Sequence, residues 1–308
     1  MEKLQHVLEA QQFTRTFLET ELFPLTKKME QVARERNDHS LSGKIVYHLF
    51  YEPSTRTRIS FETATTILGG IALSTENASA FSSAIKGETV EDTVRVINGY
   101  HHNAIIIRHK EEGAAARAAV VSKIPIINAG DGTGQHPTQA LLDVYTIYEH
   151  FQTLDGIRVA MVGDLAHGRT VNSLAYLMAK FRGIHIDFVS PTLFRVQQDI
   201  KDYLERHPVS YNETTNLGEV LKDIDVLYMT RAQTERFRQG ERFDNHHGGF
   251  KMDLVMLNRM QPNSIVMHPL PRNDELPPEL DNDPRVVCFR QAQNGLYVRM
   301  ALLKMLLS

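Results

Sequence analysis

The stretch Ser54-Thr55-Arg56-Thr57-Arg58 decides the fold, because it lies where a strand-like segment meets a helix-like one. Residues 44–50 form an apolar run typical of a buried strand, and residues 55–68 have a helical pattern that ends at Gly69-Gly70. A helix start has unpaired N–H groups and a positive dipole end, and arginine matches phosphate oxygens. The stretch therefore predicts a phosphate site; the alternative is an ordinary serine cap followed by solvated arginines.

The composition indicates a globular protein with two domains. Its 308 residues suffice for two domains of about 100–200 residues each. The formal net charge of -3 argues against nucleic-acid binding, which needs a basic face. The single cysteine, Cys288, excludes an internal disulfide and a thiolate zinc cluster and fits a reducing compartment. No secretory signal or membrane-spanning run occurs, so we expect a cytoplasmic protein without a membrane partner.

Apolar strand-like segments alternate with amphipathic helical segments, which predicts an α/β fold. Strands are expected at 44–50, 71–74, 104–108, 124–128, 158–163, 185–190, 226–230 and 264–268. Helices are expected between them, at 89–99, 138–151, 171–181 and 219–222, and at the end of the chain, at 295–307. Continuously apolar strands in this alternation are typical of parallel sheets with helices on both faces. We therefore expect two doubly wound domains, 1–150 and 151–290, followed by a C-terminal segment, 291–308.

Residues suited to binding follow the predicted strands repeatedly. They are residues 54–58, Arg108, residues 130–139, residues 164–170, Arg231 and residues 269–272. In open parallel sheets, ligands bind at the carboxyl ends of the strands. We therefore expect these segments to share one cleft between the two domains.

The glycine-rich segment 130–139 runs into a helix and carries two candidate ligands of a carbonyl compound. Pro137 suits the first helical position, which needs no N–H, so His136 lies just before the helix and Gln139 one turn later. Histidine can donate to a carbonyl oxygen and glutamine can bind an amide; the alternative is a turn histidine without a ligand. The glycine spacing does not match the dinucleotide-binding fingerprint.

Residues 163–170 nearly match the nucleotide-binding P-loop, but Arg169 stands where that motif has lysine. Arginine replaces that lysine poorly, and no later apolar strand ends in a clear aspartate that would hold magnesium. We therefore interpret Arg169 as a clamp for a carboxylate. Arg231 and Gln233 follow another strand and suit the same task; a surface position is the alternative for either arginine alone.

Residues 79–86, which include Lys86, are expected to form a mobile loop.

The sequence has no motif for several other kinds of chemistry. There is no H-E-x-x-H motif, no Cys/His ligand spacing and no G-x-S-x-G elbow. The sequence therefore predicts no metal, no cofactor and no serine hydrolase.

Three motifs together resemble the carbamoyltransferase family. They are Ser54-Thr55-Arg56-Thr57-Arg58, His136-Pro137-x-Gln139 and His268-Pro269-Leu270-Pro271-Arg272, and their order and spacing match along nearly the whole chain. His-Pro-Leu-Pro at 268–271 and Arg231-x-Gln233 resemble the members that use aspartate. The members that use ornithine have a reactive cysteine after the histidine and a Ser-Met-Gly segment. The first forty residues lack the Ser-Ile-x-Asp-Leu start that is familiar in the family. This departure leaves the implied chemistry intact but weakens inferences about subunit contacts made by this segment.

The resemblance implies that carbamoyl phosphate binds on the first domain. Its phosphate is expected to contact Ser54, Thr55, Arg56 and Thr57. Its carbonyl oxygen is expected to accept hydrogen bonds from Thr57, Arg108 and His136. Its amide is expected to contact Gln139 and the backbone carbonyls of Leu270 and Pro271. Ser82 and Lys86 match the loop that the family inserts into a neighbouring subunit's site, which implies a homotrimer with shared active sites.

The resemblance further implies that aspartate binds on the second domain, held by Lys86, Arg169, Arg231 and Gln233. The products are N-carbamoyl-L-aspartate and phosphate, in pyrimidine biosynthesis. Catalysis would consist of positioning and electrostatic stabilisation by Arg56, Thr57, Lys86, Arg108 and His136. The C-terminal helix would return to the first domain.

Two alternatives stay open. In the first alternative, the acceptor of the carbamoyl group is another amino acid, such as ornithine. Arg169 and Arg231 argue against it, because two arginines suit a dicarboxylate. Or the chain is a non-catalytic carbamoyltransferase-like binding protein, which would be expected to lack Arg56, Lys86 or His136. A separate regulatory chain and nucleotide control also stay open.

Overall fold

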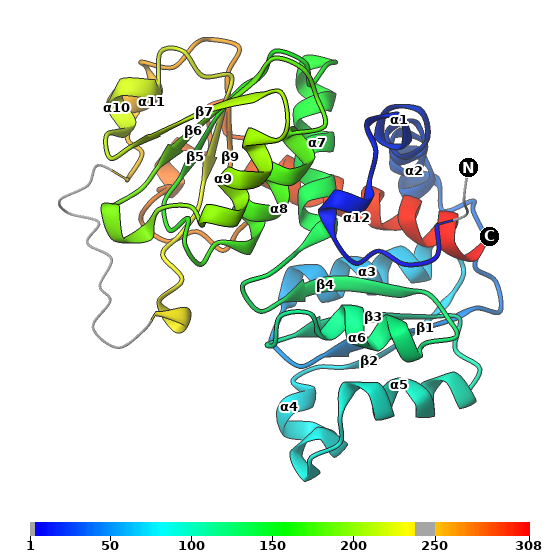
Figure 1. The fold of residues 1–308 in the computed structure, drawn as a ribbon. Helices are drawn as coiled ribbons and strands as arrows, with labels where there is room; N and C mark the ends of the chain where they lie inside the picture. The colour runs from blue at the N-terminus through cyan, green and yellow to red at the C-terminus, as the bar shows by residue number, and fades with distance from the viewer. Residues whose placement is uncertain (1–3, 238–249) are drawn as a thin grey trace. The chain divides into compact units, whose positions relative to one another are not determined.

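The computed structural model describes residues 4–237 and 250–308 (Figure 1). The chain divides into two compact units. The first contains the residues up to Leu142 together with Gln293–Ser308, and the second contains Asp143–Ala292. Each unit has its own parallel sheet, so the expected α/β fold is confirmed. Domain boundaries after 150 and 290 stay predictions; both changes of unit in the structure fall inside helices, α7 (Pro137–Phe151) and α12 (Cys288–Leu307).

The first unit is built on a four-stranded sheet in the order β2-β1-β3-β4. The strands are β1 (Ile45–Phe50), β2 (Ile71–Thr75), β3 (Ala104–His109) and β4 (Ile126–Asp131). All three neighbouring pairs are parallel. The carboxyl ends of β1, β3 and β4 therefore lie along one edge of the sheet, and the predicted site residues of this unit follow them.

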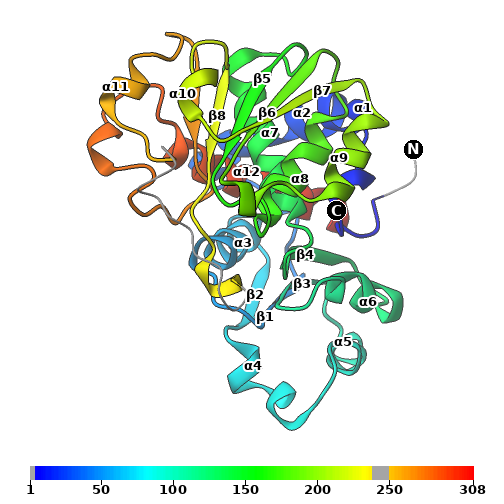
Figure 2. The ribbon, with the colours of Figure 1, turned by 60° about the vertical axis from the view of Figure 1, so that its left-hand side comes forward.

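Helices cover both faces of this sheet. Helix α3 (Thr55–Ile67) lies on one side, and α5 (Val90–Gly99) and α6 (Ala114–Val121) lie on the other (Figures 1 and 2). Buried side chains of α5, α6 and the strands form one core cluster, which includes Val94, Ala118 and Ile105. The sequence analysis missed α6, whose run of alanines has little amphipathic pattern.

The N-terminal segment of the first unit is helical, which the sequence analysis did not predict. It contains η1 (Ala10–Gln12), α1 (Arg15–Phe17), η2 (Leu18–Leu22) and α2 (Phe23–Glu35). Leu18, Leu22 and Met29 are fully buried, because the segment packs its apolar side chains into the unit. Val7 pairs with Ile127 beside β4 and so brings the chain start to the edge of the sheet.

The C-terminal helix α12 packs on the first unit, as expected. Arg299 donates from Nη1 to Oγ of Ser60 at 2.8 Å, and its guanidinium carbon lies 5.2 Å from the centroid of the Phe61 ring. The helix begins at Cys288, seven residues earlier than 295, because Gly295 lies inside it. A Cβ at Gly295 would meet Nη1 of Arg299 at 2.6 Å and Cδ2 of Leu142 at 2.9 Å, so close packing requires the glycine.

The second unit is built on a five-stranded parallel sheet in the order β7-β6-β5-β8-β9. The strands are β5 (Arg158–Val162), β6 (Ile184–Val189), β7 (Val209–Thr214), β8 (Val226–Met229) and β9 (Ile265–Met267). The sequence analysis missed β7. This strand lies at the edge of the sheet and has exposed polar residues, so it lacks the apolar run that marked the others.

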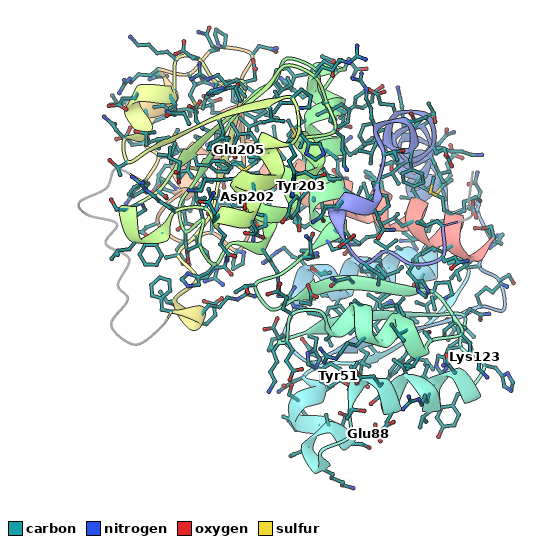
Figure 3. All side chains as sticks on the ribbon, in the orientation of Figure 1. Tyr51, Glu88, Lys123, Asp202, Tyr203 and Glu205 are labelled. Carbon is teal, nitrogen blue, oxygen red and sulfur yellow. The ribbon has the colours of Figure 1, made fainter. Side chains whose placement is uncertain are left out.

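Helices also cover both faces of the second sheet. Helices α8 (Arg169–Met178) and α9 (Gln198–Glu205) lie on one side, and α10 (Leu217–Val220) and α11 (Leu254–Leu257) on the other (Figure 2). The sequence analysis missed α9, which packs on α8 through Tyr203 (Figure 3). Its ring centroid lies 4.7 Å from that of Tyr176. In the described parts of the chain, no helix is long and apolar enough to cross a membrane.

Lys304→Met is expected to destabilise the first unit in a pH-dependent way. Burial opposes the charge of Asp38, but hydrogen bonds from Lys304 and Ser40 lower the pKa of Asp38 to about 2. The substitution should lower the free energy of unfolding at neutral pH by about 1 kcal/mol, the scale of a partly exposed ion pair. Because the folded-state pKa is depressed, the difference from wild type should shrink as the pH falls from about 4 to about 2. Urea unfolding at several pH values measures it; a pH-independent difference would contradict the ion-pair assignment.

Candidate active site

The start of α3 leaves its backbone donors without a serine cap. Ser54 is the N-cap residue, with an extended backbone, and its side chain makes no capping hydrogen bond. Thr55 and Arg56 are exposed in the first turn. Because the Ser54 side chain does not accept from the N–H groups of this turn, they suit a ligand anion, which the positive end of the helix dipole also favours.

The structure brings Thr57 and His136 together within the first unit. Thr57 lies in the first turn of α3, and His136 directly precedes α7. Oγ1 of Thr57 lies 3.5 Å from Nε2 of His136, and both residues are buried. Gln139, in the first turn of α7, is buried as well. The two helix starts that the sequence analysis singled out thus meet at one edge of the sheet.

Arg108 stands at the end of β3, beside the same edge. It is half-buried and donates from Nη1 to the backbone oxygen of Ala129 at 3.3 Å. Its Nε lies 3.5 Å from a carboxylate oxygen of Glu52, which precedes α3. Because Ala129 belongs to β4, these contacts hold the guanidinium across the ends of neighbouring strands. Arg58, the last residue of the stretch 54–58, has a structural role instead.

Arg58 forms ion pairs on its own side of α3. Its Nη1 lies 2.8 Å from Glu62, one turn later in the helix, and its Nη2 lies 2.9 Å from Glu76 after β2. The side chain thereby ties the helix to the neighbouring strand. Of the two arginines in the motif, Arg56 is the one presented to solvent at the helix start.

The segment 79–86 is not the loop that the sequence predicted. It forms two short helical turns, α4 (Ala78–Phe81) and η3 (Ser83–Lys86). The hydroxyl of Ser82 joins them, because it donates to the backbone oxygen of Ala78 at 2.7 Å and accepts from the N–H of Ala84 at 3.2 Å. Lys86 is exposed at the end of the second turn. Glu88 then accepts from the Thr93 hydroxyl at 2.7 Å, which fixes the entry to α5 (Figure 3).

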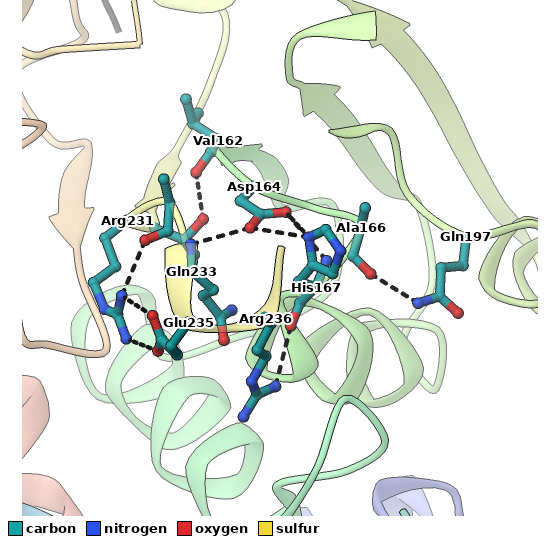
Figure 4. Close-up of polar contacts among 11 residues, drawn as sticks. Val162, Asp164, Ala166, His167, Gln197, Arg231, Gln233, Glu235 and Arg236 are labelled. Atoms are coloured by element: carbon teal, nitrogen blue, oxygen red, sulfur yellow. Dashed lines mark hydrogen bonds and ion pairs between the residues drawn. The ribbon is translucent and has the colours of Figure 1, made fainter. Parts of the chain in front are cut away.

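In the second unit, the buried carboxylate of Asp164 organises two of the strand-end loops (Figure 4). It accepts hydrogen bonds from the backbone N–H of His167 and from the backbone N–H of Gln233, each at 3.1 Å. Its Oδ1 also lies 3.0 Å from Nδ1 of His167. Gly163, just before it, has φ +121°, and a Cβ there would lie 2.3 Å from the backbone oxygen of Thr230. The loops after β5 and β8 are therefore locked together at this point.

These loops present the predicted arginines. Arg169 is the first residue of α8 and is buried, whereas Arg231 is half-buried after β8. Glu235 holds Arg231 with both carboxylate oxygens; the contact of Nη1 with Oε2 is 2.9 Å. The hydrogen bond to Glu235 raises the pKa of Arg231, and the same hydrogen bond lowers the pKa of Glu235. The pair therefore stays ionised, and its geometry fixes the guanidinium.

Glu235→Gln is expected to weaken the hold on Arg231 without disturbing the fold. Glutamine keeps one acceptor oxygen but loses the charge and the two-point contact. If Arg231 binds aspartate, KM for aspartate should rise about tenfold while KM for carbamoyl phosphate stays unchanged. Steady-state kinetics with each substrate varied in turn measures this split. Glu279→Gln, at an exposed carboxylate of the same unit, is the matched control. An unaltered KM for aspartate would show that Glu235 does not position a substrate ligand.

The segment after β9 carries Leu270 and Pro271. Leu270 has φ +55°, in the left-handed region, and its peptide bond to Pro271 is cis. Its N–H donates to Nδ1 of His268 at 2.8 Å. Nε2 of His268 lies 2.9 Å from Oε1 of Glu275, and both side chains are buried. Burial acts to raise the pKa of Glu275, but the hydrogen bonds from His268 and Asn273 outweigh it and leave the pKa lowered.

Sequence reasoning missed three carboxylates that organise these loops. They are Asp164, Glu235 and Glu275. A signal existed for Glu235, since it stands four residues after Arg231, at the spacing of an ion pair. Asp164 lies in the segment 164–170 that the sequence analysis singled out after a strand, but the comparison with the P-loop gave its carboxylate no role. Glu275 gives no local signal. Within the described ranges, no group of three or more His, Cys, Asp or Glu residues is placed to hold a metal ion.

Comparison with known proteins assigns both units to one family. Residues 5–149 match the carbamoyl-P binding domain of the aspartate/ornithine carbamoyltransferases, and residues 155–306 match their Asp/Orn binding domain. The chain belongs to the aspartate/ornithine carbamoyltransferase family. The resemblance noted in the three sequence motifs is thereby confirmed. The order of the two matched domains along the chain is also the order of the two sheets.

Individual carbamoyltransferases are similar over nearly the full length. Aspartate carbamoyltransferase 3, chloroplastic, of Pisum sativum is 53% identical over 309 residues, which cover 99% of this chain and 78% of that protein. The crystal structure of aspartate transcarbamoylase from Trypanosoma cruzi in complex with aspartate and phosphate has a TM-score of 0.91 and 37% identity, covering 99% of this chain and 96% of that chain. The same enzyme in complex with carbamoyl phosphate has a TM-score of 0.91 and 36% identity, covering 99% and 97%.

Proposed function

We propose that this chain transfers the carbamoyl group of carbamoyl phosphate to the amine of L-aspartate, giving N-carbamoyl-L-aspartate and phosphate. The observation that carries the proposal is the meeting of Thr57 and His136 beside an uncapped helix start. A helix start suits an anion, and a histidine beside it can donate to a carbonyl oxygen, so the pair supports carbamoyl phosphate as the ligand. The ligands of the similar Trypanosoma cruzi enzyme, aspartate, phosphate and carbamoyl phosphate, support it.

On the first unit, the start of α3 binds the phosphate in this proposal. The backbone N–H groups, the hydroxyls of Ser54, Thr55 and Thr57 and the guanidinium of Arg56 supply the donors. Arg108, His136 and Thr57 donate to the carbonyl oxygen. Gln139 and the backbone carbonyls of Leu270 and Pro271 orient the amide. Arg108 is held by its hydrogen bond to the Ala129 carbonyl oxygen, and such a preset donor favours stabilisation of the charge that develops on the oxygen.

Chemistry then proceeds by addition and elimination. The deprotonated amine of aspartate attacks the carbonyl carbon, and a C–N bond forms as the carbonyl electrons move to the oxygen. The C–O bond to phosphate then breaks, phosphate leaves with the electron pair, and the amine loses a proton. Arg169, Arg231 and Gln233 hold the carboxylates of aspartate during these steps, and Lys86 contributes a further charge.

The assembly and setting are part of the same proposal. We infer that Ser82 and Lys86 act in the site of a neighbouring subunit of a homotrimer. Their segment is short and ends in an exposed lysine, which suits a contact outside its own chain. A role in pyrimidine biosynthesis fits the reaction, and we propose the cytoplasm as its compartment. A separate regulatory chain would be detected as an additional mass when the protein is purified from its own cells.

A steady-state assay tests the function directly. The purified chain is incubated with carbamoyl phosphate and, in turn, L-aspartate, L-ornithine and an N-acylated ornithine, and the carbamoylated products are quantified. We expect product with aspartate alone, because two arginines suit a dicarboxylate. Product with ornithine would move the chain to the other branch of the family. Absence of product with every acceptor, at a concentration where carbamoyl phosphate binds, would favour a binding protein.

A further inference from the structure

The carboxylate of Asp131 closes the loop that leads from β4 to His136. Asp131 is the last residue of β4 and is buried. Its Oδ1 accepts the backbone N–H of Gln135 at 2.9 Å, and its Oδ2 accepts the backbone N–H of Gly113 at 2.8 Å. Because Gly113 lies in the segment after β3, the carboxylate joins the loops that follow two neighbouring strands.

Backbone contacts hold the same loop in place. The N–H of Asp131 donates to the carbonyl oxygen of Gln135 at 3.1 Å, and the N–H of Gly132 donates to the carbonyl oxygen of His109 at 2.9 Å. Gly132 has φ +46°, and a Cβ there would lie 2.8 Å from the backbone oxygen of Lys110. The loop therefore packs directly on the end of β3 and the residues that follow it.

These contacts fix the direction in which the side chain of His136 leaves the backbone. The carbonyl of Gln135 and the Cα of His136 belong to one planar peptide unit, so the hydrogen bond from Asp131 orients that plane. The carbonyl of His136 accepts the N–H of Gln139 at 3.0 Å, which orients the peptide plane that follows. With both planes held, the Cα–Cβ bond of His136 has one direction, toward a buried ring whose Nε2 lies 3.5 Å from Oγ1 of Thr57.

We propose that Asp131 is a positioning residue that sets where the imidazole of His136 meets Thr57. The inference rests on the proposed function, in which His136 donates to the carbonyl oxygen of carbamoyl phosphate. It adds a residue that acts through the backbone of Gln135 and not by touching the substrate. Placing a reacting group wrongly by about 1 Å can lower a rate about a hundredfold, so the aim of this donor matters.

The test measures the turnover of Asp131→Asn in two backgrounds. Asparagine keeps one acceptor oxygen but turns an NH₂ group toward a backbone N–H, so two donors face each other and the loop must shift. In the wild-type background, kcat should fall about tenfold to a hundredfold. In the His136→Ala background, the same substitution should change kcat by less than about twofold, because no imidazole is left to misplace. A residue that only supports the fold would lower kcat by the same factor in both backgrounds.

A readout without substrate follows the ring itself. In protein made with isotope-labelled histidine, the Cε1–H resonance of His136 is identified by its loss in His136→Ala. It should shift in Asp131→Asn, because the ring moves relative to Thr57.

Glu112→Gln is the matched control. Glu112 is exposed and accepts from the hydroxyl of Thr133, in the same loop, at 3.3 Å. Its substitution should leave both kcat and the His136 resonance unchanged. Thermal unfolding shows whether each protein is folded. If Asp131→Asn does not fold, Asp131→Ser takes its place, because serine is smaller and keeps one acceptor.

The outcomes are distinct for the inference and for the function on which it rests. An unchanged kcat in the folded variant, an equal loss of kcat in both backgrounds, or a His136 resonance that does not move overturns the positioning role and leaves the proposed reaction intact. The same shift of the resonance in Glu112→Gln also overturns it, since any change in the loop would then suffice. A wild type that forms no product from carbamoyl phosphate and aspartate overturns the proposed function, and the resonance then decides the positioning role alone.

Discussion

Arg56→Ala is expected to lower turnover about a hundredfold or more, on the scale of losing one preorganised donor to a developing charge. The residue is exposed in the first turn of α3, so its removal leaves no cavity and should not change the thermal midpoint. KM for carbamoyl phosphate should also rise, because the phosphate loses its charged partner. A saturation series in carbamoyl phosphate at fixed aspartate measures both effects.

Arg58→Ala is the matched control, two residues further along the same helix. Its side chain is bound to Glu62 and Glu76, so its loss should lower thermal stability and leave kcat within a few-fold of wild type. Arg56→Ala should therefore lose activity and keep its stability, whereas Arg58→Ala should lose stability and keep most of its activity. Near-normal turnover in Arg56→Ala would remove this residue from the site.

Lys86→Ala should abolish most activity as well, again about a hundredfold by the loss of a charged donor. The informative experiment mixes it with Arg56→Ala under conditions that exchange subunits. If the protein is a homotrimer in which Lys86 serves a neighbouring subunit, each mixed trimer should regain about one site in three, because one interface joins an intact lysine to an intact arginine. Activity should thus rise well above that of either variant alone.

The control for the mixing experiment is Lys123→Ala, at another exposed lysine of the first unit. This variant should be fully active alone and should gain nothing on mixing. Mass measurement confirms that subunits have exchanged. Verified exchange without recovery would mean that Lys86 acts within its own chain or outside catalysis.

The strand-end segments could be recognised in the sequence because their signals are local. A strand, a hydroxyl-rich turn and a helix start can be read within one short stretch, as at 54–58, and parallel topology then predicts which stretches share an edge. The contact of Thr57 with His136 follows from that rule. Its limits are equally physical. An edge strand such as β7 has no continuous apolar run, and the turns at 79–86 depend on the Ser82 hydroxyl and not on periodicity.

The carboxylates that steer the site residues were harder to predict. Glu275 lies seven residues from its partner His268, and their contact depends on how the segment after β9 folds back. Gln291 reaches His268 from a helix that the sequence analysis began seven residues too late. A role that depends on tertiary folding leaves no pattern in the chain, whereas a motif at a strand end does.

The C-terminal helix has a consequence for how the protein is made. Because the second unit lies between Leu142 and Gln293, it is an insertion within the first. During synthesis, the sheet that carries α3 emerges before the second unit, but residues 293–308 must follow before Arg299 can reach Ser60 and Phe61. The second unit is continuous in sequence and can fold before residues 293–308 are made. The first unit, which starts before the second along the chain, is therefore completed after it.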